Sequence, residues 1–268
     1  MMEKEAKYAL LIDADNISSR YLSTMLSEAK EFGDITIRRI YGDWTDQSKG
    51  SWKDILLENS ITPIQQYTYT SGKNSSDSAM IIDAMDILYG NDIDGFILAS
   101  SDSDFTRLAM RLRESGRDII GMGESKTPAA FVKACRVFKT LDILYNATQP
   151  KKKNKPKKKA ASVVKEPEVA PITGIEEIHE FLIDLVDAKA DEDGWMYLGE
   201  LGNNLLKQYP DFDCRNYGYK KLIEFVKNCP KLEVKSERTD NGRVKLVYVK
   251  LNQSCESWRN AEALFGKK

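Results

Sequence analysis

A stretch rich in lysine and proline near the middle of the chain constrains its architecture more than any other feature. Residues 149–171 contain two lysine triplets and four prolines but no aromatic residue. Such a stretch cannot bury enough apolar surface to offset the entropy that ordering it would cost. The 268-residue sequence therefore predicts two folded domains, over 1–148 and 172–251, joined by a flexible linker over 149–171 and followed by a tail over 252–268.

The charges are distributed unevenly, although the whole chain has a formal net charge of only −1. Residues 1–149 hold 17 basic and 22 acidic residues, and residues 166–268 hold 15 and 19, whereas residues 150–165 hold eight lysines and no acidic residue. Any surface that binds an anionic polymer is therefore expected to be local. The first candidates are the six lysines of the triplets, Lys151, Lys152, Lys153, Lys157, Lys158 and Lys159. A solvated spacer or a localisation signal would explain the same lysines equally well.

Several protein classes are excluded by what the sequence lacks. No stretch of about 18 uncharged apolar residues is present, so no membrane-spanning helix is expected, and the N-terminus lacks the apolar core of a signal peptide. The four cysteines are scattered, and the single histidine, His179, leaves little material for a zinc site or a Cys/His nucleophile. These features predict a cytoplasmic protein with reduced thiols.

Apolar strand-like runs alternate with helical runs in the first half of the chain. The expected strands cover residues 8–12, 35–41, 63–69, 95–100 and 118–122. The expected helices cover residues 19–32, 52–58, 77–88, 104–115 and 127–135. Strands that alternate with helices form βαβ units, so an α/β domain with a mostly parallel sheet is predicted. Ligands of such sheets bind beyond the carboxyl ends of the strands.

The second half of the chain has a different pattern. Helical runs cover residues 174–188, 197–209 and 217–228. Two short strands follow, over 232–236 and 244–251, and the Asn241-Gly242 pair between them is typical of a hairpin turn. Three helices and a terminal hairpin predict a small α+β domain of the winged-helix type.

Acidic residues follow two of the expected strands and begin one expected helix. Asp13 and Asp15 come directly after the first strand, Asp102 and Asp104 after the fourth, and Asp77 begins a helix. In a parallel sheet these positions meet at one edge, where neighbouring carboxylates repel one another unless a cation offsets their charge. Carboxylate oxygens suit Mg²⁺ or Mn²⁺, and such an ion can orient a phosphodiester and activate water. The sequence therefore predicts a metal site at this edge.

Three of these acidic residues also have an ordinary structural explanation. Asp77 and Asp104 could cap the helices that begin beside them, and Asp15 could bond its own backbone in a turn. Asp83 and Asp86 lie one turn apart inside a helix, where we expect them to face water or support a neighbour. However, two acidic motifs, at Asp13 and at Asp102, each come directly after a very apolar strand. Their joint occurrence favours a shared metal site over separate structural roles.

Three motifs of the first half resemble those of the NYN domain, a PIN-like family related to bacterial LabA-type proteins. They are Asp13-Ala-Asp15-Asn16, the segment from Lys73 to Asp77, and Ser101-Asp102-Ser-Asp104-Phe105, and the resemblance spans about residues 5–146. It implies a PIN-like α/β/α fold and a metal-dependent ribonuclease, a hydrolase. The metal-site positions that it implies are Asp13, Asp77 and Asp102, with Asp104 beside them, and Asn16 is implied to hydrogen-bond a ligand or water.

Segments of the second half resemble the OST-HTH domain, also called LOTUS, over about residues 172–250. They begin at Trp195, Tyr209 and Tyr217. The resemblance implies a module that binds RNA, single-stranded or structured, or a protein partner. We expect a small core from Trp195, Leu198, Leu201, Phe212 and Leu222, and exposed RNA contacts from Tyr217, Tyr219, Lys220 and Lys221, because lysines reach phosphates and aromatic faces stack on bases.

The sequence leaves three functions open. The leading hypothesis is a metal-dependent ribonuclease with a tethered RNA-binding domain, which acts without a membrane and could form an oligomer. The second is a non-catalytic RNA-binding adaptor that keeps the same fold. The third is an aspartate-nucleophile phosphatase, because Asp13-Ala-Asp15 after the first strand also fits the opening of haloacid-dehalogenase-like enzymes, although Asn16 and Ile17 depart from their usual pattern.

Overall fold

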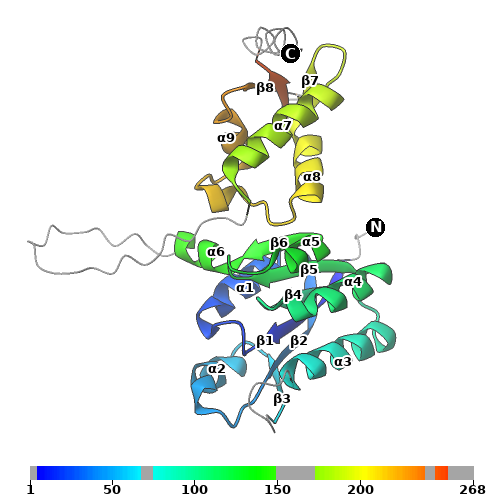
Figure 1. Cartoon of the computed structure of the whole chain (residues 1–268), viewed down its shortest axis with the longest axis vertical. Helices are drawn as coiled ribbons and strands as arrows, with labels where there is room; N and C mark the ends of the chain where they lie inside the picture. The colour runs from blue at the N-terminus through cyan, green and yellow to red at the C-terminus, as the bar shows by residue number, and fades with distance from the viewer. Residues whose placement is uncertain (1–4, 68–74, 149–172, 239–244, 253–268) are drawn as a thin grey trace, which may run out of the picture. The chain divides into compact units, whose positions relative to one another are not determined.

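The structure is a computed structural model, and it describes residues 5–67, 75–148, 173–238 and 245–252 (Figure 1). These residues form two compact units, one within Met1–Ile172 and one within Thr173–Lys268. The expected linker over 149–171 and the tail from residue 253 onwards lie outside the described residues. The same is true of Lys73 and of the six lysines of the triplets, Lys151, Lys152, Lys153, Lys157, Lys158 and Lys159.

A parallel sheet of six strands forms the centre of the first unit. Its strands are β1 (Lys7–Asp13), β2 (Asp34–Gly42), β3 (Thr62–Gln65), β4 (Gly95–Ala99), β5 (Asp118–Gly123) and β6 (Val137–Thr140). Their order is β3-β2-β1-β4-β5-β6. The chain adds strands in one direction from β1 to β3 and in the other from β4 to β6, so the order reverses between β1 and β4. In open α/β sheets this switch point is where ligands bind.

Helices cover both faces of this sheet, which makes three layers. Side chains of α3 (Ser75–Gly90), α4 (Thr106–Glu114) and α5 (Ala129–Ala134) pack into one apolar cluster. Those of α1 (Leu22–Ala29), α2 (Gly50–Leu56) and α6 (Leu141–Thr148) pack into the cluster on the opposite face. Because strands β1 and β4 are covered on both sides, they are apolar almost throughout, as a strand buried on both faces must be. The predicted PIN-like α/β/α fold is confirmed.

The last strand and helix of the unit, β6 and α6, were not expected from the sequence. Lys139 interrupts the apolar pattern of β6, yet its side chain is buried. The Lys139 Nζ atom lies 2.9 Å from a carboxylate oxygen of Glu28 on α1, which is buried as well. A buried charge is tolerated only when it is paired. The ion pair therefore allows a strand where the sequence pattern alone argues against one.

The second unit is a small α+β fold, as predicted. Its helices are α7 (Ile175–Lys189), α8 (Leu198–Gln208) and α9 (Leu222–Lys227). Its strands β7 (Trp195–Tyr197), β8 (Leu232–Arg238) and β9 (Lys245–Leu251) form an antiparallel sheet in the order β7-β9-β8. The expected helix over 217–228 is shorter, because Gly218 adopts a left-handed conformation (φ 84°) after a 3-10 turn and ends that turn. The expected hairpin turn lies outside the described residues.

None of the helices in the described residues is long and apolar enough to cross a membrane.

Candidate metal centre

The carboxyl ends of the central strands lie at one edge of the first unit's sheet. β1 ends at Asp13, and β4 ends one residue before Ser100, from which the chain continues into Asp102. The helix α3 begins with Ser75, so Asp77 belongs to its first turn. Since β1 and β4 are neighbours in the sheet, the residues that follow them lie together at the switch point, and the first turn of α3 adds Asp77.

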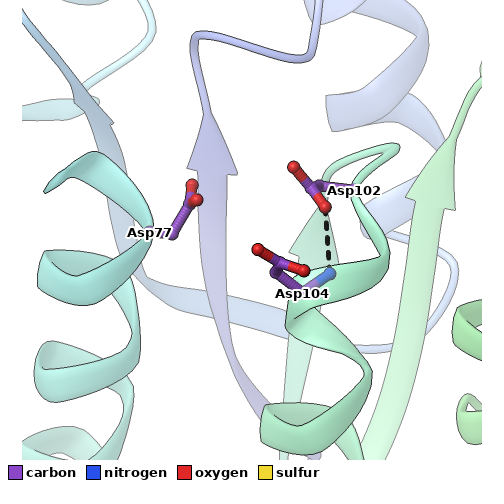
Figure 2. Close-up of side chains that lie close together, drawn as sticks. All are labelled: Asp77, Asp102 and Asp104. Carbon is purple, nitrogen blue, oxygen red and sulfur yellow. Dashed lines mark hydrogen bonds between the residues drawn. The ribbon is translucent and has the colours of Figure 1, made fainter. Parts of the chain in front are cut away.

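Three carboxylates converge at this edge. Asp77, Asp102 and Asp104 each offer one oxygen, and these oxygens all lie within 4.8 Å of one another. Figure 2 shows Asp77 projecting from α3 toward the two aspartates of the turn that precedes α4. Asp77 is buried, Asp102 is half-buried and Asp104 is exposed, so the cluster is open on one side.

The turn before α4 fixes two of the three carboxylates. The Asp104 backbone N–H donates to Oδ1 of Asp102 at 2.9 Å, so Asp102 caps the 3-10 turn Ser103–Phe105 (Figure 2). The alternative that Asp104 caps the next helix is therefore wrong, because α4 has Phe105 at its N-cap position. With the cap supplied by Asp102, the carboxylate of Asp104 lies beside that of Asp102.

Crowding and burial disturb the ionisation of this cluster. They raise the pKa of Asp77 from 3.8 to about 6, first through burial and then through the negative charges of Asp13, Asp102 and Asp104. Both causes penalise the ionised form of the buried carboxyl. A cation at the cluster would remove this penalty.

Asp13 is held differently from the three clustered carboxylates. It is 1% exposed, and each of its oxygens accepts two hydrogen bonds. Oδ1 accepts from the backbone N–H groups of Asp15 and Asn16, at 3.0 and 3.3 Å. Oδ2 accepts from the Asn16 side-chain amide at 2.7 Å and from the Ser100 hydroxyl at 2.8 Å. The side-chain amide of Asn16 thus donates to Asp13. The resemblance had implied that it would instead hydrogen-bond a ligand or water.

Ser100 was missed in the sequence, although it connects the two motifs. Its hydroxyl donates to Asp13 and accepts from the backbone N–H of Asp102 at 3.0 Å, and the residue is fully buried. The available signal was its position, because a serine directly after a fully apolar strand has backbone and carboxylate partners within reach at the strand end. Ser101, which belongs to the motif that resembles the NYN domain, follows Ser100, and its hydroxyl accepts from the Glu124 backbone N–H at 2.9 Å.

The other acidic residues singled out in the sequence lie outside this cluster. Asp15 pairs with Lys49, whose Nζ lies 2.6 Å from Oδ1. Asp83 accepts hydrogen bonds from Arg39 and Tyr41 and so supports the sheet below α3. Asp86 is exposed on the same helix. These placements agree with the expectation that Asp83 and Asp86 support a neighbour or face water.

The expected RNA contacts of the second unit need correction. The ring of Tyr217 stacks on Phe212 with centroids 5.8 Å apart, and its hydroxyl donates to the Thr173 carbonyl at 2.9 Å. Tyr219 packs edge-on against Phe225. Both tyrosines are half-buried and pack against the core, so the expectation that they present exposed aromatic faces is wrong. Lys220 and Lys221 are exposed, as expected.

The expected core of this unit is correct except for one residue. The side chains that pack in the core include Leu198, Leu201, Phe212 and Leu222. Trp195 lies on β7 beside Met196, and the alternation of the strand turns Met196 into the core and Trp195 to the other face of the sheet.

Both units of the chain match known domain families. The family model of the NYN domain matches residues 7–142, about half of the chain, and that of the OST-HTH/LOTUS domain matches residues 173–244. An uncharacterized protein of Methanocaldococcus jannaschii is 28% identical over 123 residues, which cover 44% of this chain and 48% of that protein. The chain thus spans about half the length of this curated relative. A crystal structure of a protein of unknown function from Vibrio parahaemolyticus shares 19% identity with a TM-score of 0.44, covering 51% of this chain and 94% of that one.

Proposed function

The chain belongs to the NYN-domain family, and we propose that it is a metal-dependent ribonuclease that hydrolyses RNA phosphodiester bonds. The observation that carries the proposal is the convergence of Asp77, Asp102 and Asp104 at the carboxyl edge of the sheet. The raised pKa of Asp77 supports it, since the desolvation and repulsion behind that pKa are what a bound cation would offset. NYN domains are generally ribonucleases, which agrees with the chemistry of these residues.

The donor set fits a divalent cation such as Mg²⁺ or Mn²⁺, because all three donors are carboxylates and hard cations prefer oxygen ligands. When bound, the cation would stabilise negative charge on the phosphate and favour ionisation of the attacking water. Asp77, Asp102 and Asp104 would hold it. Asn16 and Ser100 would keep the buried charge of Asp13 in a fixed orientation beside them.

The placement of Asp13 argues against the phosphatase hypothesis. A nucleophilic carboxylate must present an oxygen to the phosphorus atom, yet Asp13 is 1% exposed and its oxygens already accept four hydrogen bonds. Its pKa is raised by burial, which disfavours the ionised, nucleophilic form. The same contacts suit a carboxylate that positions its neighbours.

RNA is the partner that we propose for both units. The OST-HTH/LOTUS match over residues 173–244 supports an RNA-binding role for the second unit. The first unit supplies the carboxylate cluster, and the second would hold the substrate close to it through a chain connection.

A cleavage assay tests the proposal. Purified full-length protein is incubated with fluorescently labelled RNA in Mg²⁺, Mn²⁺ or EDTA. We expect cleavage in a divalent metal ion and none in EDTA, and we expect Asp102→Asn to abolish it. Asp86→Asn is the matched control, because Asp86 is an exposed aspartate that lies on α3, away from its first turn.

The outcomes separate the three functions. Cleavage in EDTA, or full activity in both Asp77→Asn and Asp102→Asn, would contradict the metal site. Tight RNA binding without turnover in any metal ion would identify an adaptor. Hydrolysis of a simple phosphomonoester with loss of activity in Asp13→Asn alone would identify a phosphatase.

A further inference from the structure

The sheet of the second unit has one face toward the core and one face away from it. On the core face lie Met196 of β7, Leu232 of β8 and Val249 of β9. Strand alternation and the pairing register place the intervening side chains on the opposite face, among them three aromatic residues, two lysines and the glutamates Glu233 and Glu237. We call the aromatic residues and lysines of this face the aromatic face; it consists of Trp195, Tyr197, Lys235, Tyr248 and Lys250.

The register makes these five residues direct neighbours. Trp195 pairs with Lys250, Tyr197 pairs with Tyr248, and Tyr248 pairs on its other side with Lys235. The rings of Tyr197 and Tyr248 lie with their centroids 6.0 Å apart. Three aromatic rings and two lysines therefore form one continuous surface across all three strands.

The lysines lie over the rings. The Lys235 Nζ atom is 4.2 Å from the centroid of the Trp195 ring and 5.6 Å from that of Tyr248. The Lys250 Nζ atom is 5.8 Å from the Trp195 ring. Cation–π attraction at these distances keeps the two ammonium groups close to the rings. Each lysine ammonium group therefore lies next to an aromatic ring on this surface.

Two glycines leave the room that this arrangement needs. A Cβ atom on Gly199 would lie 2.5 Å from the Tyr197 ring, so the ring rests on the bare backbone of α8. A Cβ atom on Gly194 would lie 3.1 Å from the Lys250 side chain. Tyr197 is nevertheless 46% exposed, because the glycine side of the ring is the side that is covered.

We propose that the aromatic face binds single-stranded RNA, with bases stacked on its rings and phosphates paired with its two lysines. Rings and cations in alternation are what sequence-tolerant binding of single strands requires. A docking site for a protein would differ, because the centres of protein interfaces are depleted of charged residues. The choice of RNA over other polyanions rests on the proposed function.

Two acidic residues share this face with the lysines. Glu233 on β8 is exposed and lies opposite Lys250 in the pairing register. Glu237 on β8 pairs with Lys235, with Oε1 and Nζ 3.0 Å apart, and both side chains are more than one-third exposed. Exposed ion pairs are weak, so a phosphate can replace the carboxylate. Removing Glu237 should therefore strengthen RNA binding, whereas removing Lys235 should weaken it.

Binding is measured on the full-length protein in EDTA, which prevents metal-dependent cleavage, by the fluorescence anisotropy of labelled oligouridine. We expect Trp195→Ala and Tyr197→Ala each to lower the affinity by at least about five-fold, the low end for one stacked base. Lys235→Gln should reduce the slope of log affinity against log salt by about 0.7. Glu237→Gln should raise the affinity.

The controls carry the same kinds of substitution on other surfaces. Tyr89→Ala, at the end of α3, and Lys227→Gln, on α9, change exposed residues and should leave binding unchanged. Thermal unfolding checks that each variant is folded, and Tyr197→Ala is safest in that respect because the ring is half exposed.

Two results would overturn the proposal. One is unchanged affinity in folded Trp195→Ala and Tyr197→Ala proteins. The other is a dimer, seen by analytical ultracentrifugation, that these substitutions dissociate, because the surface would then be an interface between two copies. Failure of the ribonuclease proposal is distinguishable, since cleavage in a divalent metal ion is tested with Asp102→Asn, whereas the aromatic face is tested by the loss of binding in EDTA in Trp195→Ala and Tyr197→Ala.

Discussion

Replacing Asp77 with asparagine should make the metal-free protein more stable at neutral pH. The carboxyl of Asp77 is 7% exposed and lies close to other carboxylates, and its pKa is about 6 against an ordinary value of 3.8. This displacement corresponds to about 3 kcal/mol of unfavourable free energy in the ionised folded state. Solvent at the open side of the cluster reduces the penalty. Asp77 also lies in the first turn of α3, where the helix dipole stabilises a negative charge, and this offsets about 0.3–1 kcal/mol of the penalty. We therefore expect Asp77→Asn to raise the free energy of unfolding by about 1–2 kcal/mol.

The pH dependence of this gain has a definite sign. Below pH 3.8 the Asp77 carboxyl is protonated in both the folded and the unfolded chain, so asparagine brings no advantage. Between about pH 4 and pH 6 the folded protein binds this proton more tightly than the unfolded chain does. Its free energy of unfolding therefore falls as the pH rises. Above pH 6 the full penalty is present, and the advantage of the variant should be constant.

Urea unfolding in EDTA, followed by circular dichroism at pH 4 and pH 8, measures both quantities. Asp86→Asn is the control and should change stability little at either pH, because Asp86 is exposed. In buffer without EDTA, free Mn²⁺ at a hundred times its dissociation constant should stabilise the wild-type protein by about 2.7 kcal/mol, and Asp77→Asn should lose most of this effect. A variant that is less stable than wild type at pH 8 in EDTA, or that keeps the whole Mn²⁺ effect, would refute the electrostatic account of the cluster.

Three further sets of substitutions test other parts of the chain. Ser100→Ala removes a buried hydroxyl that donates to Asp13 and accepts from the Asp102 backbone N–H; it should cost about 1–3 kcal/mol in urea unfolding and lower kcat in the RNA assay more than it raises KM. Lys139→Met leaves Glu28 buried without its 2.9 Å partner and should cost about 3–5 kcal/mol, most of which Glu28→Leu in the same chain should restore. Replacing the lysines of 151–153 and 157–159 with glutamine should flatten the salt dependence of RNA binding by about 0.7 for each phosphate that these lysines neutralise, and an unchanged slope would favour a solvated spacer.

Much of the first unit followed from the sequence because its strands and helices are strongly patterned. The runs that became β1 and β4 are apolar because helices bury them on both faces, and that pattern is visible in the sequence alone. Parallel pairing then requires that residues after these strands meet at one edge, so the convergence of Asp77 with Asp102 was predictable. The strand β6 was not, because the buried partner of Lys139 lies on a distant helix.

The roles of individual side chains at the edge were less predictable than their positions. Spacing placed Asp13 and Asn16 at the end of β1, but only the hydrogen bonds show that the amide of Asn16 serves Asp13. In the second unit two aromatic residues were predicted the wrong way round. Trp195 was expected in the core and Tyr217 on the surface, whereas Tyr217 packs against the core and Trp195 does not. An aromatic residue fits either position. The face of a three-residue strand such as β7 depends on its register with β9, which no short pattern reveals.

The charge of the candidate site implies that metal and RNA bind to it cooperatively. The clustered carboxylates and the RNA backbone are both negative, so in the absence of a cation the cluster repels the polymer that it would cleave. A divalent cation at the cluster would offset most of this repulsion and offer a phosphate oxygen a ligand position. Linkage then requires RNA to increase the affinity for the cation by the same factor by which the cation increases the affinity for RNA. RNA that binds only at the aromatic face would leave the cation affinity unchanged. The experiment measures how much added RNA changes the affinity for Mn²⁺, in wild type and in Tyr197→Ala. It therefore reports whether an RNA strand held by the second unit also reaches the carboxylates of the first.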